Sequence, residues 1–204
     1  MLDRDKDITE QTGLIKAFTL RGLSEIFYQK SNFMIAFFLT SIFIGYLYLV
    51  MISKSKSFEL ADGGIKSLGT SFGFDQSDVI VFFTSRTDEM ITGYIQFNQI
   101  WDTLFGLTYG LMYVVWVSVL FKPFSERLGV LNLFPLIQVV FDWLENYNLV
   151  SIGNQYLADG LTSSSNVQMA SLFSMIKWAC SGLTSTFILL GILLLISRTI
   201  FNKK

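Results

Sequence analysis

Four long apolar stretches divide the chain, at about residues 33–52, 101–121, 128–146 and 169–196. At 1.5 Å per residue, about 20 helical residues cover the roughly 30 Å hydrocarbon core of a bilayer. We see no internal repeat and no linker between the stretches, so residues 1–204 are predicted to form a single membrane domain. The pattern predicts an all-α fold, an integral membrane bundle of four transmembrane helices.

Two segments outside the predicted spans also have helical periodicity. Residues 8–28, within a predicted cytoplasmic segment 1–32, mix apolar and charged residues as an amphipathic helix does. This helix either lies on the membrane face or packs against the bundle. In the predicted extracytoplasmic loop 53–100, Asp75 fits the N-cap of another helix. An apolar stripe then leads directly into the second span, through Val79, Phe83, Met90, Tyr94 and Phe97.

The distribution of Lys and Arg predicts the orientation of the spans. The N-terminal segment, the turn at 122–127 and the C-terminal tail contain Lys and Arg, whereas residues 146–168 contain neither. Segments rich in Lys and Arg stay on the cytoplasmic side. We therefore expect a multi-pass integral membrane protein with both termini in the cytoplasm. Lys54 and Lys56, which this orientation places outside, are the observation against it.

Composition narrows the chemistry that the chain can perform. Apolar residues make up 51% of the chain and the mean hydropathy is +0.50, above the range of ordinary soluble domains. The net charge of −1 gives no basis for binding nucleic acid. The chain has no His and a single cysteine, Cys180, so the commonest metal ligands are missing. We therefore expect no metal site, no intrachain disulfide and no cofactor.

Polar residues at helical spacing mark one face of three spans. They are Asn98, Asp102, Tyr109 and Tyr113 in the second, Gln138, Asp142, Glu145 and Asn146 in the third, and Ser174, Lys177, Ser181 and Thr184 in the fourth. A charged side chain within a span costs roughly 2.5–3.5 kcal/mol, so these faces should meet inside the bundle. The predicted polar cluster consists of Asp102, Gln138, Asp142, Glu145, Asn146 and Lys177. Its possible cavity lining consists of Tyr109, Tyr113, Ser174 and Ser181.

The charged members of this cluster share one depth in the predicted topology. Asp102 begins the second span, Asp142 and Glu145 end the third, and each end faces outward. Lys177 lies in the outer half of the fourth span and can reach Asp142 or Glu145. One interpretation is an ion pair that fixes the register of the helices. The other is an outward-facing polar cavity for a cation, an amine or a lipid headgroup, because three acids face one lysine.

Three small or rigid residues in the spans predict local geometry. Pro135 lies inside the predicted third span, where it removes a backbone hydrogen bond and should kink the helix. That kink is either tolerated without function or opens the cavity beside Gln138 and Asp142. Gly106 and Gly110 have the spacing of a small-xxx-small contact, which lets two helices approach closely.

The sequence contains no set of residues that we associate with membrane enzymes. Lipid phosphatases and the familiar serine and zinc intramembrane proteases need His. The Gly-x-Gly-Asp motif of intramembrane aspartyl proteases does not occur, nor do a P-loop or a Gly-x-Ser-x-Gly elbow. We therefore expect that the protein is not an enzyme.

Two segments of the last two predicted spans carry a resemblance. Leu133–Asn146 reads LFPLIQVVFDWLEN, and Ser171–Trp178 reads SLFSMIKW. They resemble bacterial four-span membrane proteins with Asp-x-Leu-Glu-Asn in span three and Lys-Trp in span four. No activity follows from this resemblance. It implies that the two acids and the asparagine of the first segment belong to one constellation with Lys177.

Two functional hypotheses remain open at this point. The small size, the missing catalytic set and the amphipathic flanking helices favour a non-enzymatic accessory or scaffold subunit of a membrane protein complex. Its predicted partners are membrane lipids, and other membrane subunits or further copies of the chain. The alternative is a binding or transport protein that uses the outward-facing polar cavity for a cation, an amine or a lipid headgroup.

Overall fold

The computed structural model describes residues 19–61, 63–64, 67–124 and 131–201, and the regular structure in these ranges is entirely helical. The elements are α2 (Leu20–Lys30), α3 (Phe33–Tyr46), η1 (Leu47–Met51), α4 (Ile52–Ser55), η2 (Leu68–Thr70), α5 (Gln76–Thr84), α6 (Asp88–Gln96), η3 (Phe97–Asp102), α7 (Thr103–Phe121), α8 (Phe134–Asp159) and α9 (Ser164–Phe201). The predicted all-α fold is confirmed for this part of the chain.

Three continuous helices in the described ranges are long and apolar enough to cross a membrane. They cover Phe33–Ser55, Asp88–Phe121 and Ser164–Ile200, and they contain the predicted first, second and fourth spans. The helix in the place of the predicted third span, α8, is not among them. The polar face of α8 lowers its mean hydropathy below that of α3, α7 and α9. Helix length and composition therefore support three membrane crossings and do not decide whether α8 is a fourth.

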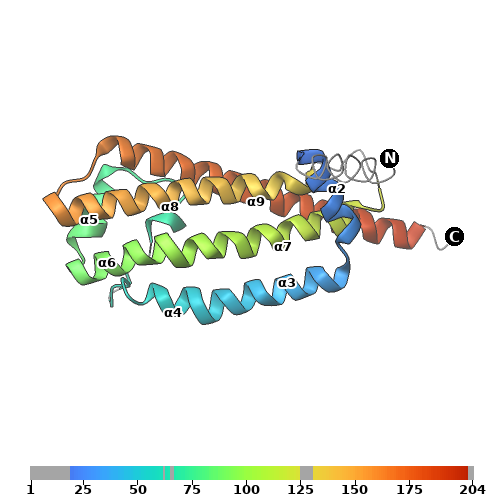
Figure 1. The fold of residues 1–204 in the computed structure, drawn as a ribbon, viewed down its shortest axis with the longest axis horizontal. Coiled ribbons are helices and arrows are strands. Elements are labelled where there is room, and N and C mark those ends of the chain that lie inside the picture. The colour runs from blue at the N-terminus through green and yellow to red at the C-terminus, as the bar shows by residue number, and fades with distance from the viewer. Residues whose placement is uncertain (1–18, 62, 65–66, 125–130, 202–204) are drawn as a thin grey trace, which may run out of the picture.

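The long helices lie side by side in an elongated bundle (Figure 1). α3 packs on α7, α7 on α8, and α8 on α9, which also contacts α7. α7 and α9 run in the same direction and α8 runs back between their ends (Figure 1). α2 lies at one end of the bundle, while α5 and α6 lie at the other.

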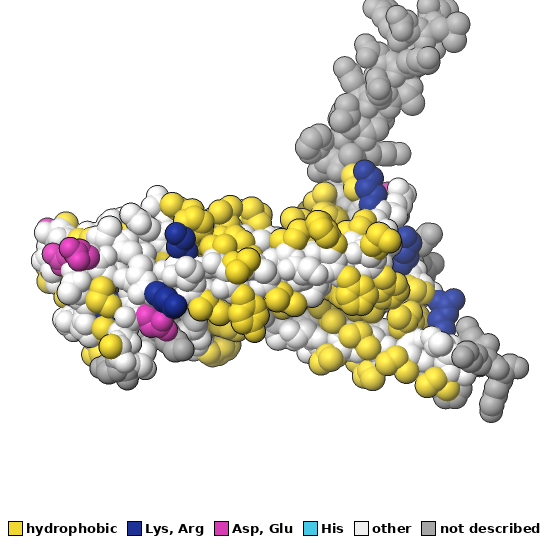
Figure 2. All heavy atoms as spheres, turned by 90° about the horizontal axis from the view of Figure 1, so that it is seen from below, with side chains coloured by type: hydrophobic (Ala, Val, Ile, Leu, Met, Phe, Trp, Pro, Cys, Tyr) yellow, Lys and Arg dark blue, Asp and Glu magenta, His cyan; other side chains and the backbone are white. Residues whose placement is uncertain are grey.

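Apolar and charged side chains are distributed unevenly along this bundle. Figure 2 shows apolar side chains gathered along one face, Lys and Arg at the α2 end, and acidic side chains at the α5–α6 end, where further Lys or Arg also lie. The largest buried apolar cluster also belongs to the α5–α6 end and includes Phe58, Phe82, Phe83, Tyr94 and Ile152. The bundle therefore has a packed apolar cluster at the α5–α6 end, which we call the apolar cap. The long helices extend from this cap toward the α2 end and expose apolar faces.

The amphipathic stretch after Asp75 forms two helices, and the prediction of one helix leading into the second span was wrong. Asp75 is the N-cap of α5, as expected, and accepts hydrogen bonds from the backbone amides of Ser77 and Asp78. Hydrogen bonds from the Ser77 hydroxyl and these amides hold the pKa of Asp75 below its usual value. α5 ends at Thr84, and α6 alone continues through η3 into α7.

The break between α5 and α6 is stabilised by a buried arginine. Arg86 Nε donates to the carbonyl oxygen of Phe58 at 2.8 Å, and Nη1 donates to that of Phe82 at 2.7 Å. The guanidinium also lies over the Phe82 ring. These contacts tie the turn to the apolar cap, and Thr87 then begins α6 by accepting a hydrogen bond from the amide of Met90.

The boundaries of α8 differ from those of the predicted third span. The predicted start, 128–130, lies outside the described residues, and the helix begins at Phe134. It continues to Asp159, where Gly160 adopts a left-handed conformation with φ of +67°, so most of the predicted connection 146–168 is helical. α6 packs against α8, and α9 packs along it.

Pro135 starts α8 and does not kink it, so this expectation was also wrong. It is the second residue of the helix. The first backbone N–H groups of a helix have no partner within it, so the missing N–H of proline removes no helical hydrogen bond there. The idea that a proline kink opens a cavity therefore does not apply.

The described part of the predicted helix 8–28 is α2, and residues 8–18 lie outside the described residues. α2 packs against the bundle through a buried polar contact. Ser24 Oγ donates to Asn132 Oδ1 at 2.7 Å, and Asn132 Nδ2 donates to the Ser24 carbonyl at 3.1 Å and to Ser118 Oγ at 2.9 Å. Asn132 therefore joins α2, α7 and the start of α8.

Replacement of Asn132 with alanine is expected to lower the free energy of unfolding by about 1–3 kcal/mol, because it removes the buried hydrogen bonds that Asn132 makes with Ser24 and Ser118. Thermal denaturation of the protein in mild detergent measures this loss. Asn148→Ala is the matched control, since the Asn148 side chain donates to the Leu144 carbonyl of its own helix. Equal losses in both variants would refute the role of Asn132.

Candidate functional site

The polar face of α8 points into the bundle. Gln138, Asp142, Glu145 and Asn146 recur at helical spacing and are all buried. α9 packs along this face and brings Lys177 opposite the two acids. The helical spacing thus gathers on one side of α8 the polar side chains that a membrane-spanning helix could not expose to lipid.

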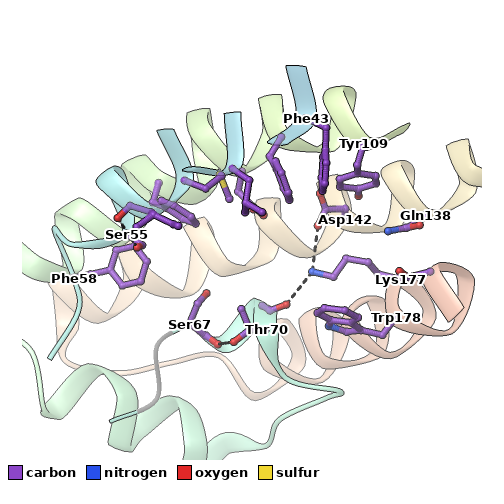
Figure 3. A pocket seen from close by; sticks show the side chains of 18 of the residues that line it. Phe43, Ser55, Phe58, Ser67, Thr70, Tyr109, Gln138, Asp142, Lys177 and Trp178 are labelled. Atoms are coloured by element: carbon purple, nitrogen blue, oxygen red, sulfur yellow. Dashed lines mark hydrogen bonds and ion pairs between the residues drawn. The ribbon is translucent and has the colours of Figure 1, made fainter. Parts of the chain in front are cut away.

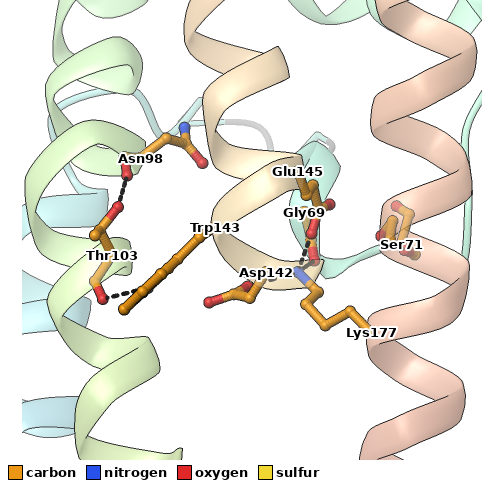
Figure 4. A network of polar contacts seen from close by, with 9 residues as sticks. Gly69, Ser71, Asn98, Thr103, Asp142, Trp143, Glu145 and Lys177 are labelled. Carbon is orange, nitrogen blue, oxygen red and sulfur yellow. Dashed lines mark hydrogen bonds and ion pairs between the residues drawn. The ribbon is translucent and has the colours of Figure 1, made fainter. Parts of the chain in front are cut away.

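Lys177 is the centre of this arrangement (Figure 4). Its Nζ atom lies 3.1 Å from Asp142 Oδ1 and forms a second ion pair with Glu145 Oε2. It also donates a hydrogen bond of 3.0 Å to the carbonyl oxygen of Gly69. The contact predicted between Lys177 and Asp142 or Glu145 is therefore present with both acids. The ammonium group of Lys177 therefore contacts two carboxylate oxygens and one carbonyl oxygen.

The carbonyl of Gly69 belongs to a loop that covers this cluster, which the sequence did not predict. Ser174 Oγ donates to the Ser71 carbonyl at 2.8 Å, and the Phe74 amide donates to Ser171 Oγ at 2.9 Å. A Cβ atom at Gly69 would lie 3.4 Å from Glu145 Oε1, so the backbone approaches the acid closely. Polar residues of α9 thus bind this loop as well as the acids of α8.

Two glycines of α7 bring that helix against the acidic face of α8. A Cβ atom at Gly110 would lie 2.5 Å from Val139 Cγ2, and one at Gly106 would lie 3.1 Å from Asp142 Oδ2. The predicted small-xxx-small contact is therefore confirmed. Trp143 Nε1 donates to the Thr103 carbonyl at 3.0 Å and fixes the same pair of helices (Figure 4). This close approach places the α7 side chains next to Asp142.

A cavity of about 400 Å³ lies beside these residues (Figure 3). Its polar lining includes residues that the sequence had predicted, namely Asp102, Tyr109, Tyr113, Gln138, Asp142, Lys177 and Ser181. Glu145, Asn146 and Ser174, also predicted for the site, are buried but do not line the cavity. In Figure 3 the ring of Phe43, on α3, and that of Trp178, on α9, lie on opposite sides of the cavity.

The apolar wall of the cavity was not predicted. It comes mainly from α3, η1, α4 and η3, with Phe43, Leu47, Met51, Phe58 and Phe97 among its residues. Apolar residues in a membrane helix face lipid, protein or ligand alike, so their sequence pattern carries no signal for a cavity. Only the packing of α3 against α7 identifies the side chains that line it.

Several buried acceptors at the site have no hydrogen-bond partner among the described residues. At the cavity they are Asp142 Oδ2, Gln138 Oε1 and the Tyr109 hydroxyl oxygen. Asp102 adds a half-buried carboxylate to the same lining. Unpaired polar atoms are costly in a low-dielectric interior. Asp142 Oδ2 and Gln138 Oε1 require hydrogen-bond donors, whereas the Tyr109 hydroxyl can itself donate.

The charges of the site are also unbalanced. Lys177 and Glu145 compensate each other, because they form a buried ion pair. Asp142 shares the same lysine, and Asp102 contributes a further carboxylate to the cavity lining. The cavity therefore has an excess of negative charge, unless carboxylates carry protons.

Two π-helical turns, η1 and η3, lie against each other at this level of the bundle. Leu47 and Met51 of η1, and Phe97 and Asp102 of η3, line the cavity. Short π-helical turns within α-helices occur frequently at functional sites. In η3 the Thr103 hydroxyl donates to the carbonyl of Asn98, five residues earlier, at 2.9 Å. The π-helical turn η3 sets the orientation of Asp102, its last residue. A hydropathy pattern does not predict such a turn.

The described residues include no group of three or more His, Cys, Asp or Glu side chains that could hold a metal ion. The position between Asp142 and Glu145 is taken by the Lys177 ammonium group. The arrangement can instead accept hydrogen bonds and stabilise positive charge.

No protein family, curated protein or solved structure matches this chain. The resemblance to bacterial four-span membrane proteins therefore stays a prediction.

Proposed function

We propose that the protein is a four-span membrane protein in which α8 is the third crossing. α7 and α9, which both belong to helices apolar enough to span, run in the same direction (Figure 1). The chain must therefore return between them, and α8 has 26 residues, or roughly 39 Å of helix. Its polar residues Gln138, Asp142, Glu145 and Asn146 are buried, and its exposed acid, Asp159, is the last residue of the helix.

We propose that the α2 end of the bundle faces the cytoplasm. Arg21, Lys30, Lys122 and Arg198 lie at that end, and acidic side chains lie at the α5–α6 end (Figure 2). This agrees with the tendency of Lys and Arg to stay inside. The cavity then lies in the outer half of the membrane and its far end reaches the outer surface.

We propose that this cavity binds an organic cation. The observation that carries the proposal is the position of the Lys177 ammonium group, which contacts Asp142, Glu145 and the Gly69 carbonyl. An anion such as a phosphate group would have to compete with these two carboxylates for the lysine. The cavity offers carboxylate, amide and hydroxyl oxygens instead, and a ligand ammonium group supplies both the donors and the charge that they require.

The hypothesis of an accessory or scaffold subunit has less support. The exposed apolar faces of α3 and α9 could contact another subunit, but lipid covers such faces equally well. Enzymatic activity is not proposed, since no nucleophile with an adjacent base lines the cavity in the described residues.

Three probes of matched size, benzylammonium, benzoate and benzyl alcohol, test the proposal. We expect that calorimetric titration of the protein in lipid nanodiscs detects binding of benzylammonium alone. Asp102→Asn should weaken this binding at least about 30-fold, because removing one partner of a desolvated charge pair costs about 2–5 kcal/mol. Asp102 makes no ion pair that the described residues need for packing, so the variant should still fold.

The matched control is Asp88→Asn, which removes an exposed acid of α6 that does not line the cavity. It should bind benzylammonium as the wild type does. A cation site beside Asp102 would be refuted if benzoate bound as tightly as benzylammonium or more tightly. It would also be refuted if Asp102→Asn and Asp88→Asn weakened benzylammonium binding equally.

A further inference from the structure

The polarity of the cavity changes along its length. Asp142, Lys177 and Tyr109 lie at one end, near Phe43, whereas Ser55 and Phe58 lie at the other (Figure 3). From Phe43 to Ser55 the chain advances twelve residues, or roughly 18 Å of helix. Between these two ends, Leu47, Met51 and Ile52 form an apolar wall, and Ser67 and Thr70 lie across from Phe58 toward Trp178 (Figure 3). Asp142 and Lys177 are thus at the deep end, and a passage with an apolar wall connects them to the outer end, where Glu59 lies.

The outer end of the passage lies at the membrane surface. Ser55 is followed by Lys56 and preceded by Lys54, and both lysines are exposed. Exposed lysines at the end of an apolar helix mark the boundary between hydrocarbon and water. Ser55, Glu59 and Ser67 give this end of the cavity a polar rim. In the proposed orientation this end of the cavity is therefore the one nearer to the outer aqueous side.

A membrane lipid has the opposite polarity. In the outer leaflet its headgroup is at the surface and its chains point toward the bilayer centre, whereas here the charged groups are deeper than the apolar passage. The volume of about 400 Å³ is also near the lower limit for small-molecule sites, which is about 300 Å³. Both features favour a compact ligand over a lipid headgroup with its chains.

The geometry points to a compact aryl-alkyl amine as the ligand class, bound with its ammonium group beside Asp102 and Asp142 and its apolar body toward Ser55. This inference rests on the proposed cation site and adds the size, the orientation and the route of the ligand. The aromatic side chains of Phe58 and Phe97, which pack against each other, give the apolar body a matching wall. The ammonium group enters first, from the outer aqueous side.

A series of ammonium ions tests the ligand class in nanodiscs. 4-Phenylbutylammonium should bind up to about 60-fold more tightly than benzylammonium, because each of three further buried methylenes adds roughly fourfold. Hexadecylammonium should not displace it at concentrations that leave the bilayer intact. If hexadecylammonium displaced 4-phenylbutylammonium, and if Asp102→Asn weakened hexadecylammonium binding, the compact-ligand inference would be overturned but the cation site would stand. Binding of none of the three would refute the cation site itself.

Chemical modification tests the route. In a Cys180→Ser background, Ser55→Cys is labelled with a bulky, membrane-impermeant maleimide, and 4-phenylbutylammonium is then titrated. We expect at least a tenfold loss of affinity. Thr92→Cys, an exposed position on α6 that does not line the cavity, is the matched control and should show no loss when labelled. Unchanged affinity after labelling at residue 55 would overturn access from the outer side.

Discussion

Replacement of Lys177 with methionine is expected to destabilise the protein by about 3–5 kcal/mol and to reduce the yield of folded protein sharply. Lys177 is buried and its ammonium group contacts Asp142, Glu145 and the Gly69 carbonyl. Methionine has a similar length but leaves two buried acids uncompensated, and breaking a buried ion pair in this way costs about 3–5 kcal/mol. Size-exclusion chromatography and thermal denaturation in mild detergent measure the loss.

Two further variants separate this electrostatic role from a simple loss of packing. Lys56→Met changes an exposed lysine and should leave stability within about 0.5 kcal/mol of the wild type. Charge reversal, with Lys177→Glu and Glu145→Lys combined, should recover part of the stability that Lys177→Glu alone loses. A Lys177→Met protein as stable as the wild type would contradict the structural role of this lysine.

Replacement of Gly110 with valine should separate α7 from α8 and destabilise the protein by about 1–3 kcal/mol or more, as overpacking does. A Cβ atom at Gly110 already lies within 2.5 Å of Val139 Cγ2, and the branched side chain of valine adds two methyl groups. Moving α7 also shifts Tyr109 away from Asp142. The variant should therefore lose benzylammonium binding together with its stability, which calorimetry and thermal denaturation measure on the same sample.

Gly182→Val is the matched control for this substitution. Gly182 also lies within a long helix, but a Cβ atom there meets nothing within 4 Å. Both variants exchange a helical glycine for the same β-branched residue, so their difference isolates the contact with Val139. If both variants lost the same stability, the close approach of α7 and α8 at Gly110 would not be important for the fold.

The sequence predicted the parts of this structure that follow from periodicity and from the cost of burying charge. Long apolar runs indicated the helices, and the spacing of Gln138, Asp142 and Glu145 indicated one polar helix face. The cost of a charge in lipid required a partner for Lys177, and the nearest acids at the same depth were Asp142 and Glu145. These inferences need only the geometry of a single helix and an approximate topology.

The features that the sequence did not predict depend on contacts between distant segments. Pro135 begins α8 because the helix starts later than hydropathy suggests. The helix breaks at Arg86, whose guanidinium donates to the carbonyl of Phe58 in a distant segment and to that of Phe82 in the preceding helix α5. Lys177 donates a hydrogen bond to the carbonyl of Gly69, more than one hundred residues earlier in the chain. No local pattern encodes such pairings, although they decide which kind of ligand the cavity can accept.

The most direct test of the cation site is a distance measurement by solid-state NMR. The protein is labelled with ¹³C at its Asp carboxyl carbons and is saturated in liposomes with ¹⁵N-benzylammonium. We predict that dipolar recoupling finds the ammonium nitrogen within about 4–6 Å of a carboxyl carbon, the range in which opposite charges act on one another strongly. This contact should weaken in Asp102→Asn. A saturated sample without any such contact, or one whose contact is unchanged in Asp102→Asn, would contradict a cation site formed by these carboxylates.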